Sequence, residues 1–126
     1  MTPSADAGAP APPAPTLLTL VTGGTAPLRE QAIAAIAPAG AAVLLEGMPS
    51  GTNYLPDHVR VERIAPGCLC CTGNLVLRVT LNRILRRHPE RLYIGLASTE
   101  HLDQLRSWLS APPYDQLLSL TPDLDA

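Results

Sequence analysis

Short apolar runs alternate with segments of helical periodicity along most of this chain, and this alternation constrains the fold more than any other feature. Residues 17–21, 41–45, 59–64 and 91–97 have the length and composition of buried or half-buried strands. Residues 27–36, 74–87 and 99–109 carry apolar side chains at helical spacing, and residues 116–120 are expected to form a last strand. Strands that alternate with helices form mainly parallel sheets. We therefore expect an α/β fold of three layers, with helices flanking a mainly parallel sheet.

The first 16 residues differ from the rest because Ala and Pro dominate them. Repeated prolines remove backbone donors and prevent a helix or a strand from forming. We expect a disordered tail over residues 1–16 and one α/β domain over residues 17–126. The tail has neither the basic start nor the apolar core of a secretory signal, and no apolar run approaches the ~20 residues that span a bilayer. A cytoplasmic protein without a membrane partner is the expectation.

The charged residues give no global sign of a nucleic-acid partner. The chain has nine arginines, no lysine and eleven acidic residues, for a net charge of −2. Five of the arginines lie between residues 78 and 91. We interpret them as the solvated face of a helix in preference to a basic binding stripe.

Three cysteines, Cys68, Cys70 and Cys71, follow Gly67 within four positions, between a predicted strand and a predicted helix. The start of a helix lowers thiol pKa, and thiolates are soft ligands that suit Zn²⁺. Three thiolates leave one tetrahedral position for water, a fourth side chain or an incoming ligand. Simple burial of one or two cysteines is the alternative interpretation.

The segment IAPGCLCCTGNL, residues 64–75, is followed by an arginine-bearing helix and resembles the C-x-C-C segment of the CobW-like P-loop GTPases, a family of metal chaperones. The resemblance extends over roughly residues 17–120, which would be the N-terminal half of such a protein. It implies a P-loop NTPase-like fold, truncated after this half. It also implies zinc or a related metal on Cys68, Cys70 and Cys71, with GTP hydrolysis driving metal transfer.

The phosphate loop of that family, G-x-x-x-x-G-K-[ST], is degenerate here. Counted from Gly23, Leu28 takes the second glycine position, Arg29 the lysine and Glu30 the hydroxyl residue. Leu28 would block the approach of backbone to phosphate, and the Glu30 carboxylate would repel it. Gly23, Gly24, Arg29 and Glu30 are therefore predicted as remnants of a nucleotide site, and tight binding of GTP with Mg²⁺ is not expected.

Two further residues are candidates for a fourth metal ligand. Glu46 ends the second predicted strand and His101 follows the fourth, although a solvated strand-end carboxylate and a surface histidine are the simpler interpretations. We predict a non-hydrolysing zinc-binding protein, a metallochaperone or accessory module, that engages a protein partner or client metalloprotein. A divergent GTPase that uses Arg29, a thiol redox or regulatory protein, and a relic domain without chemistry are the alternatives. The metal, the client and the oligomeric state stay open.

Overall fold

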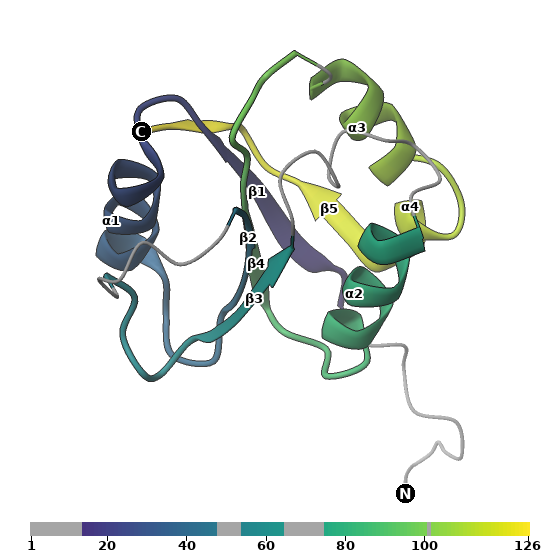
Figure 1. Cartoon of the computed structure of the whole chain (residues 1–126). Coiled ribbons are helices and arrows are strands. Elements are labelled where there is room, and N and C mark those ends of the chain that lie inside the picture. Colours follow the sequence, from purple (N-terminus) through teal and green to yellow (C-terminus); the bar gives the residue numbers. More distant parts are fainter. Residues whose placement is uncertain (1–13, 48–53, 65–74, 101) are drawn as a thin grey trace, which may run out of the picture.

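The computed structural model describes residues 14–47, 54–64, 75–100 and 102–126 (Figure 1). The elements, in chain order, are β1 (Thr16–Thr22), α1 (Ala26–Ile36), β2 (Ala42–Glu46), β3 (Arg60–Ile64), α2 (Leu75–Leu85), β4 (Arg91–Gly95), α3 (Leu102–Leu109), α4 (Tyr114–Leu117), β5 (Leu118–Leu120) and β6 (Leu124–Asp125). None of the helices in these ranges is long and apolar enough to cross a bilayer.

The strands form one parallel sheet in the order β3-β2-β4-β1-β5, and β6 also pairs with β1. The central strands β1, β2 and β4 are buried along nearly their whole length because both of their faces are covered. The strand β3 is more polar and lies at one end of the order. The predicted α/β fold with a mainly parallel sheet is confirmed.

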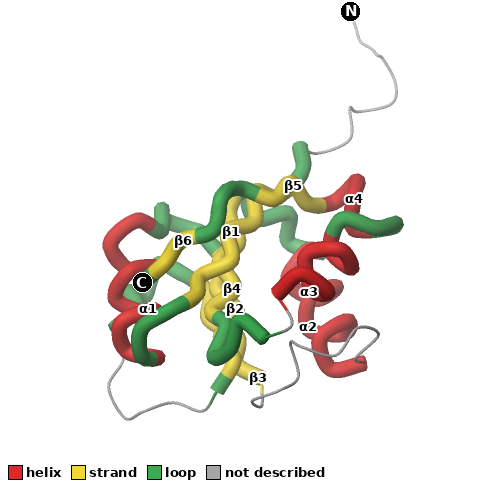
Figure 2. The backbone as a smooth tube through the Cα atoms, turned by 90° about the horizontal axis from the view of Figure 1, so that it is seen from above, coloured by secondary structure: helices red, strands yellow, loops and turns green. Residues whose placement is uncertain are grey.

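Helices cover both faces of the sheet, which gives the three expected layers (Figure 2). On one face, α1 packs through Ile33 against Val21, Val43, Leu45 and Tyr93. On the other face, α2, α3 and α4 cover a larger cluster that includes Leu18, Leu44, Leu92 and Ile94. Leu77 and Leu81 of α2 are almost completely buried there, as their spacing predicts.

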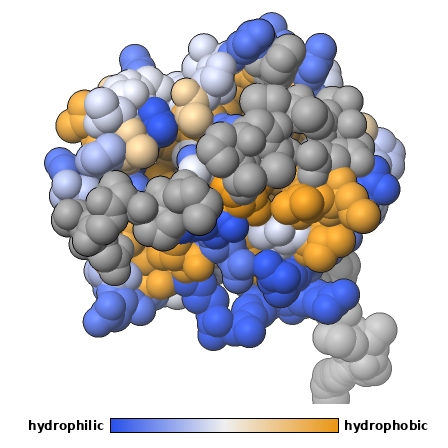
Figure 3. All heavy atoms as spheres, viewed as in Figure 1, coloured by the Kyte–Doolittle hydropathy of each residue, from blue (hydrophilic) through white to orange (hydrophobic). Residues whose placement is uncertain are grey.

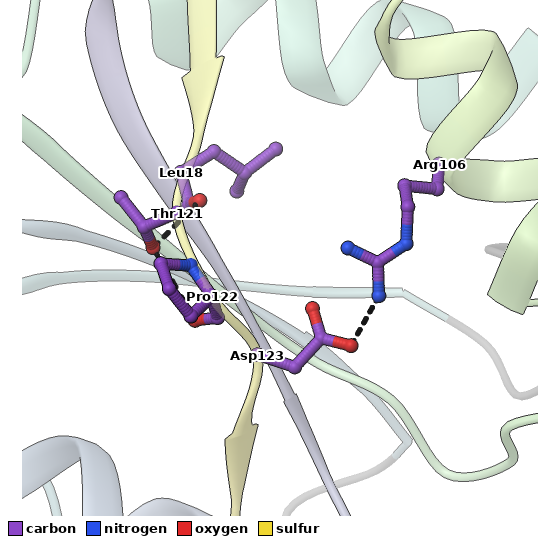
Figure 4. A network of polar contacts seen from close by, with 5 residues as sticks. All are labelled: Leu18, Arg106, Thr121, Pro122 and Asp123. Atoms are coloured by element: carbon purple, nitrogen blue, oxygen red, sulfur yellow. Dashed lines mark hydrogen bonds and ion pairs between the residues drawn. The ribbon is translucent and has the colours of Figure 1, made fainter.

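The last segment of the chain is tied to the centre of the sheet and to α3 (Figure 4). The backbone N–H of Thr121 donates to the carbonyl of Leu18 over 2.8 Å, and Asp123 forms an ion pair with Arg106. The Thr121 hydroxyl also lies 2.6 Å from that of Thr19. These contacts fix the segment between β5 and β6, so that both strands lie alongside β1.

The C-terminal part departs from the sequence prediction. The strand predicted over residues 116–120 begins only at Leu118, because residues 116 and 117 belong to α4. The strand β6 was not predicted at all. A two-residue strand carries no periodicity, and its place depends on pairing with a segment about a hundred residues away.

The apolar face predicted for α1 is partly wrong. The helix starts as expected, with Pro27 in its first turn and the Thr25 side chain accepting a hydrogen bond from the N–H of Leu28. However, Leu28 and Ile36 are about half exposed, whereas Arg29 and Glu30 are buried. The two charged side chains point inward because each finds a polar partner there, as described below.

Candidate functional site

The candidate site lies at the carboxyl edge of the sheet, where ligands of parallel α/β proteins bind. The ends of β1, β2, β3 and β4 meet at this edge. Glu46 is the register partner of Ile64, and Gly95 is the partner of both Val21 and Leu45. Gly23, Gly24 and Glu46 all follow or end these strands, as the sequence predicts.

A short glycine turn connects β1 to α1. Gly23 and Gly24 both adopt positive φ, at 78° and 57°, and Thr25 caps the helix that begins at Ala26. This left-handed conformation is accessible to glycine at little cost. The turn between strand and helix is therefore only three residues long.

The Arg29 side chain folds back onto this turn. Its Nη1 atom donates hydrogen bonds of 3.0 Å to the carbonyl oxygens of both Gly23 and Gly24. Only 8% of the residue is exposed. The positive charge at the lysine position of the degenerate motif is thus bound to the backbone of the loop itself.

The C-terminal strand closes over the same turn. Asp125 is the register partner of Thr22, and the N–H of Ala126 donates to the carbonyl of Thr22 over 2.7 Å. A methyl group built on Gly23 would lie 2.0 Å from Oδ1 of Asp125. One built on Gly24 would lie 3.2 Å from Cβ of Leu28. A carboxylate and an apolar side chain thus lie directly against the loop.

Sequence reasoning missed Asp125, because nothing in the local sequence marks it. Its position follows from the pairing of β6 with β1, which joins segments far apart in the chain. An aspartate near the end of a chain otherwise looks like an ordinary solvated residue.

Glu30 forms an ion pair across the sheet-to-helix interface. Its Oε1 atom lies 3.4 Å from Nη2 of Arg63 in β3, and the Glu30 side chain is only 4% exposed. The pair links α1 to the strand at the end of the sheet. This contact accounts for a carboxylate in the interior, since buried charges are normally paired.

Glu46 lies at the carboxyl end of β2 and is also buried, with 6% of the residue exposed. Its Oε1 atom accepts a hydrogen bond of 2.9 Å from the N–H of Ala97, just beyond β4. The interpretation of Glu46 as a solvated strand-end carboxylate is therefore wrong. The side chain is held between two neighbouring strand ends at the candidate site.

The cysteine cluster, Cys68, Cys70 and Cys71, and also His101, lie outside the described residues. The described chain leads into the cysteine segment from Ile64, the partner of Glu46, and continues from Leu75 at the start of α2. Within the described ranges, no three His, Cys, Asp or Glu side chains are grouped closely enough to hold a metal ion.

Comparisons with known proteins give one informative relationship. No family model matches the chain, and no solved structure matches it. The zinc chaperone YeiR of Escherichia coli (strain K12) is 35% identical over 65 residues, which make up 51% of this chain and 20% of YeiR. The match therefore spans about a fifth of the length of that relative. The chain is a distant homologue of a zinc chaperone over about half of its own length, and this confirms the relationship to the CobW-like metal chaperones that its cysteine segment indicates.

Proposed function

We propose that this chain binds zinc through Cys68, Cys70 and Cys71 and passes it to a protein partner, without hydrolysing GTP. The homology to a zinc chaperone supports the choice of metal and of function. The donor set fits, because zinc prefers tetrahedral coordination by thiolates. Three thiolates with one exchangeable position suit transfer better than a closed site with four protein ligands.

Glu46 is the proposed fourth ligand, with His101 as the alternative. The Glu46 carboxylate lies at the strand ends beside Ile64, from which the cysteine segment continues. The hydrogen bond from Ala97 orients it. Carboxylates that ligate metals are themselves commonly held by such hydrogen bonds.

The hydrogen bonds from Arg29 to the carbonyl oxygens of Gly23 and Gly24 support the proposal that GTP is not hydrolysed. A phosphate could approach the turn only if Arg29 gave up these bonds and the Asp125 carboxylate moved away from Gly23. The carboxylate would also repel the phosphate charge. These contacts disfavour the alternative of a divergent GTPase in which Arg29 replaces the lysine.

Zinc binding is tested by titrating the reduced protein with zinc against a chromophoric chelator. We expect the wild type to bind one zinc ion and Cys68→Ser/Cys70→Ser to lose at least 100-fold in affinity, because two thiolate ligands are removed. His58→Ser, which changes an exposed histidine, should behave like the wild type. Equal zinc affinity of the wild type and the double variant would contradict the proposal.

The fourth ligand is tested in the same assay with Glu46→Gln, which keeps an oxygen able to accept from Ala97 but removes the charge. We expect about a tenfold loss of zinc affinity. Glu90→Gln, an exposed residue directly before β4, is the matched control and should have no effect. If only His101→Ala weakens zinc binding, histidine is the fourth ligand and the assignment of Glu46 is wrong.

Nucleotide binding is tested by calorimetry with GTP and Mg²⁺. We expect no binding at micromolar concentrations. Micromolar binding by the wild type that disappears in Arg29→Ala would establish the divergent GTPase and contradict the proposal. The result is independent of the zinc titration, so the two halves of the proposed function can fail separately.

A further inference from the structure

The strand β3, at one end of the sheet, lies beside one flank of α2, and the two are here called the β3–α2 face. It consists of Arg60 and Glu62 of β3 and of Val76, Val79 and Arg83 of α2. Among the described strands, β3 pairs only with β2, so its other edge faces no described strand. Such an edge presents backbone groups to which an extended segment can pair.

The flank of α2 is brought to this edge by an ion pair. Nη2 of Arg83 lies 2.8 Å from Oε1 of Glu62. Val76, Val79 and Arg83 are spaced by three and four residues and therefore share one side of the helix. Val76 and Val79 are 49% and 51% exposed, although they lie on a helix whose other side forms the core.

This apolar stripe is visible on the surface of the molecule. Figure 3 shows an exposed hydrophobic area over α2, bordered by strongly hydrophilic side chains. Leu75, at the start of α2, is 70% exposed. Exposed apolar side chains that gather beside polar ones mark an interaction site more often than scattered ones do.

Charge separates this region from the rest of the chain. The face itself carries two arginines, Arg60 and Arg83, and one acidic residue, Glu62, which is paired with Arg83. The chain as a whole is acidic, with a net charge of −2. A local basic region on an acidic chain favours partners with negative charge and speeds their association.

We propose that the β3–α2 face binds an extended segment of a partner protein that carries both acidic and apolar side chains. The segment would pair with the outer edge of β3, place apolar side chains on Val76 and Val79, and pair carboxylates with Arg60 and Arg83. Strand addition supplies backbone hydrogen bonds, and arginine binds carboxylates in a bidentate manner. The surface contains no proposed zinc ligand. Binding of the segment to this face is therefore independent of the proposed zinc site.

Other occupants fit the surface less well. A second copy of the chain, paired edge to edge, would bring a β3 strand with two arginines and one glutamate, so it would supply no excess of negative charge. A nucleic acid would satisfy the arginines, but its phosphates would not cover the exposed valines. An acidic and apolar protein segment matches the charge and the hydrophobic stripe together.

The test uses a fluorescent eight-residue peptide of alternating Val and Glu, with fluorescence anisotropy as the readout. We expect the peptide to bind, and its binding to weaken as salt is raised. Arg60→Glu/Arg83→Glu should weaken binding at least tenfold. Arg78→Glu is the matched control, since it reverses a charge on the same helix near Tyr114, and it should change affinity less than twofold. Hydrogen exchange should slow in β3 when the peptide is bound.

Several results would overturn the inference. These are no binding, equal binding of a Val and Lys peptide, or an equal loss in Arg78→Glu. An oligonucleotide that binds more tightly and depends on Arg60 and Arg83 would identify a nucleic-acid site instead. Self-association in sedimentation that the double variant abolishes would identify a second copy as the occupant. The double variant should bind zinc like the wild type, so this test fails independently of the zinc site.

Discussion

Arg29 is a charged side chain that the fold buries, and its partners are the carbonyl groups of Gly23 and Gly24. It connects the first turn of α1 back to the turn before it. With both glycines at positive φ, the single guanidinium of Arg29 donates to both carbonyl oxygens. On this account Arg29 stabilises the loop, and its charge is not available to a phosphate.

Replacement of Arg29 by alanine should therefore reduce stability. A hydrogen bond that involves a charged group contributes about 1.5–3 kcal/mol to stability. We expect Arg29→Ala to lower the free energy of unfolding by about that amount. Urea denaturation followed by circular dichroism measures this change. Arg91→Ala, which removes a partly exposed arginine, should cost less than about 0.5 kcal/mol. Unchanged stability in Arg29→Ala would contradict the structural role.

Single residues also mark where prediction from sequence fails. Arg29 and Glu30 are predicted as remnants of a nucleotide site from a motif alignment, which cannot give the direction of a side chain. Glu46 was expected at a strand end, correctly, but its burial depends on a hydrogen bond to Ala97, 51 residues later. Residue type and local spacing predict where a group lies along an element, whereas its partners come from the tertiary fold.

At the scale of secondary-structure elements, two ion pairs join helices to β3, one on each face of the sheet. Glu30 of α1 meets Arg63 over 3.4 Å with its own side chain 4% exposed, while Arg83 of α2 meets Glu62 over 2.8 Å with both side chains more than a third exposed. We expect burial, and not the N–O distance, to decide how much each pair contributes to stability, because water screens the exposed pair.

We predict that the longer, buried pair matters more. Arg63→Ala should lower the free energy of unfolding by about 1–3 kcal/mol, because it removes the ion-pair partner of the buried Glu30 carboxylate. Arg83→Ala, the matched change in the exposed pair, should cost about 0.5 kcal/mol or less. Thermal or urea unfolding of both variants gives the comparison, and the reverse order would contradict it.

The short helix α4 is fixed to α2 and α3 through Tyr114. Its hydroxyl donates to Oδ1 of Asn82 over 2.9 Å, and its ring lies 4.8 Å from that of Trp108. Burial raises the pKa of Tyr114 above its ordinary value of 10.0, partly offset by the charge of Arg78. The neutral phenol is thus favoured in the folded state.

This pKa shift predicts a loss of stability in alkali. Below pH 10 the phenol is protonated in both the folded and the unfolded state, so the stabilisation is fully present. As the pH rises past 10 toward the higher folded pKa, the unfolded chain loses its proton first and unfolding becomes easier. Tyr114→Phe should remove this part of the pH dependence, measured by urea denaturation between pH 8 and 11. An unchanged alkaline slope in Tyr114→Phe would rule out this cause.

At the scale of the whole molecule, the layers could be predicted from sequence but the order of the strands could not. Apolar runs and helical spacing identified β1–β4 and α1–α3, and their alternation indicated a parallel sheet. The order β3-β2-β4-β1-β5 depends on contacts between distant segments. For the same reason the placement of Asp125 against Gly23, and the neighbourhood of β3 and α2, became visible only in the folded chain.

The central claim is that three thiolates of one short segment bind zinc. X-ray absorption at the zinc K edge of the reduced, zinc-loaded protein tests it directly, because sulfur is readily distinguished from oxygen and nitrogen by its distance. The account predicts three sulfur atoms at about 2.3 Å and one oxygen or nitrogen at about 2.0–2.2 Å. A zinc ion surrounded only by oxygen and nitrogen would contradict it.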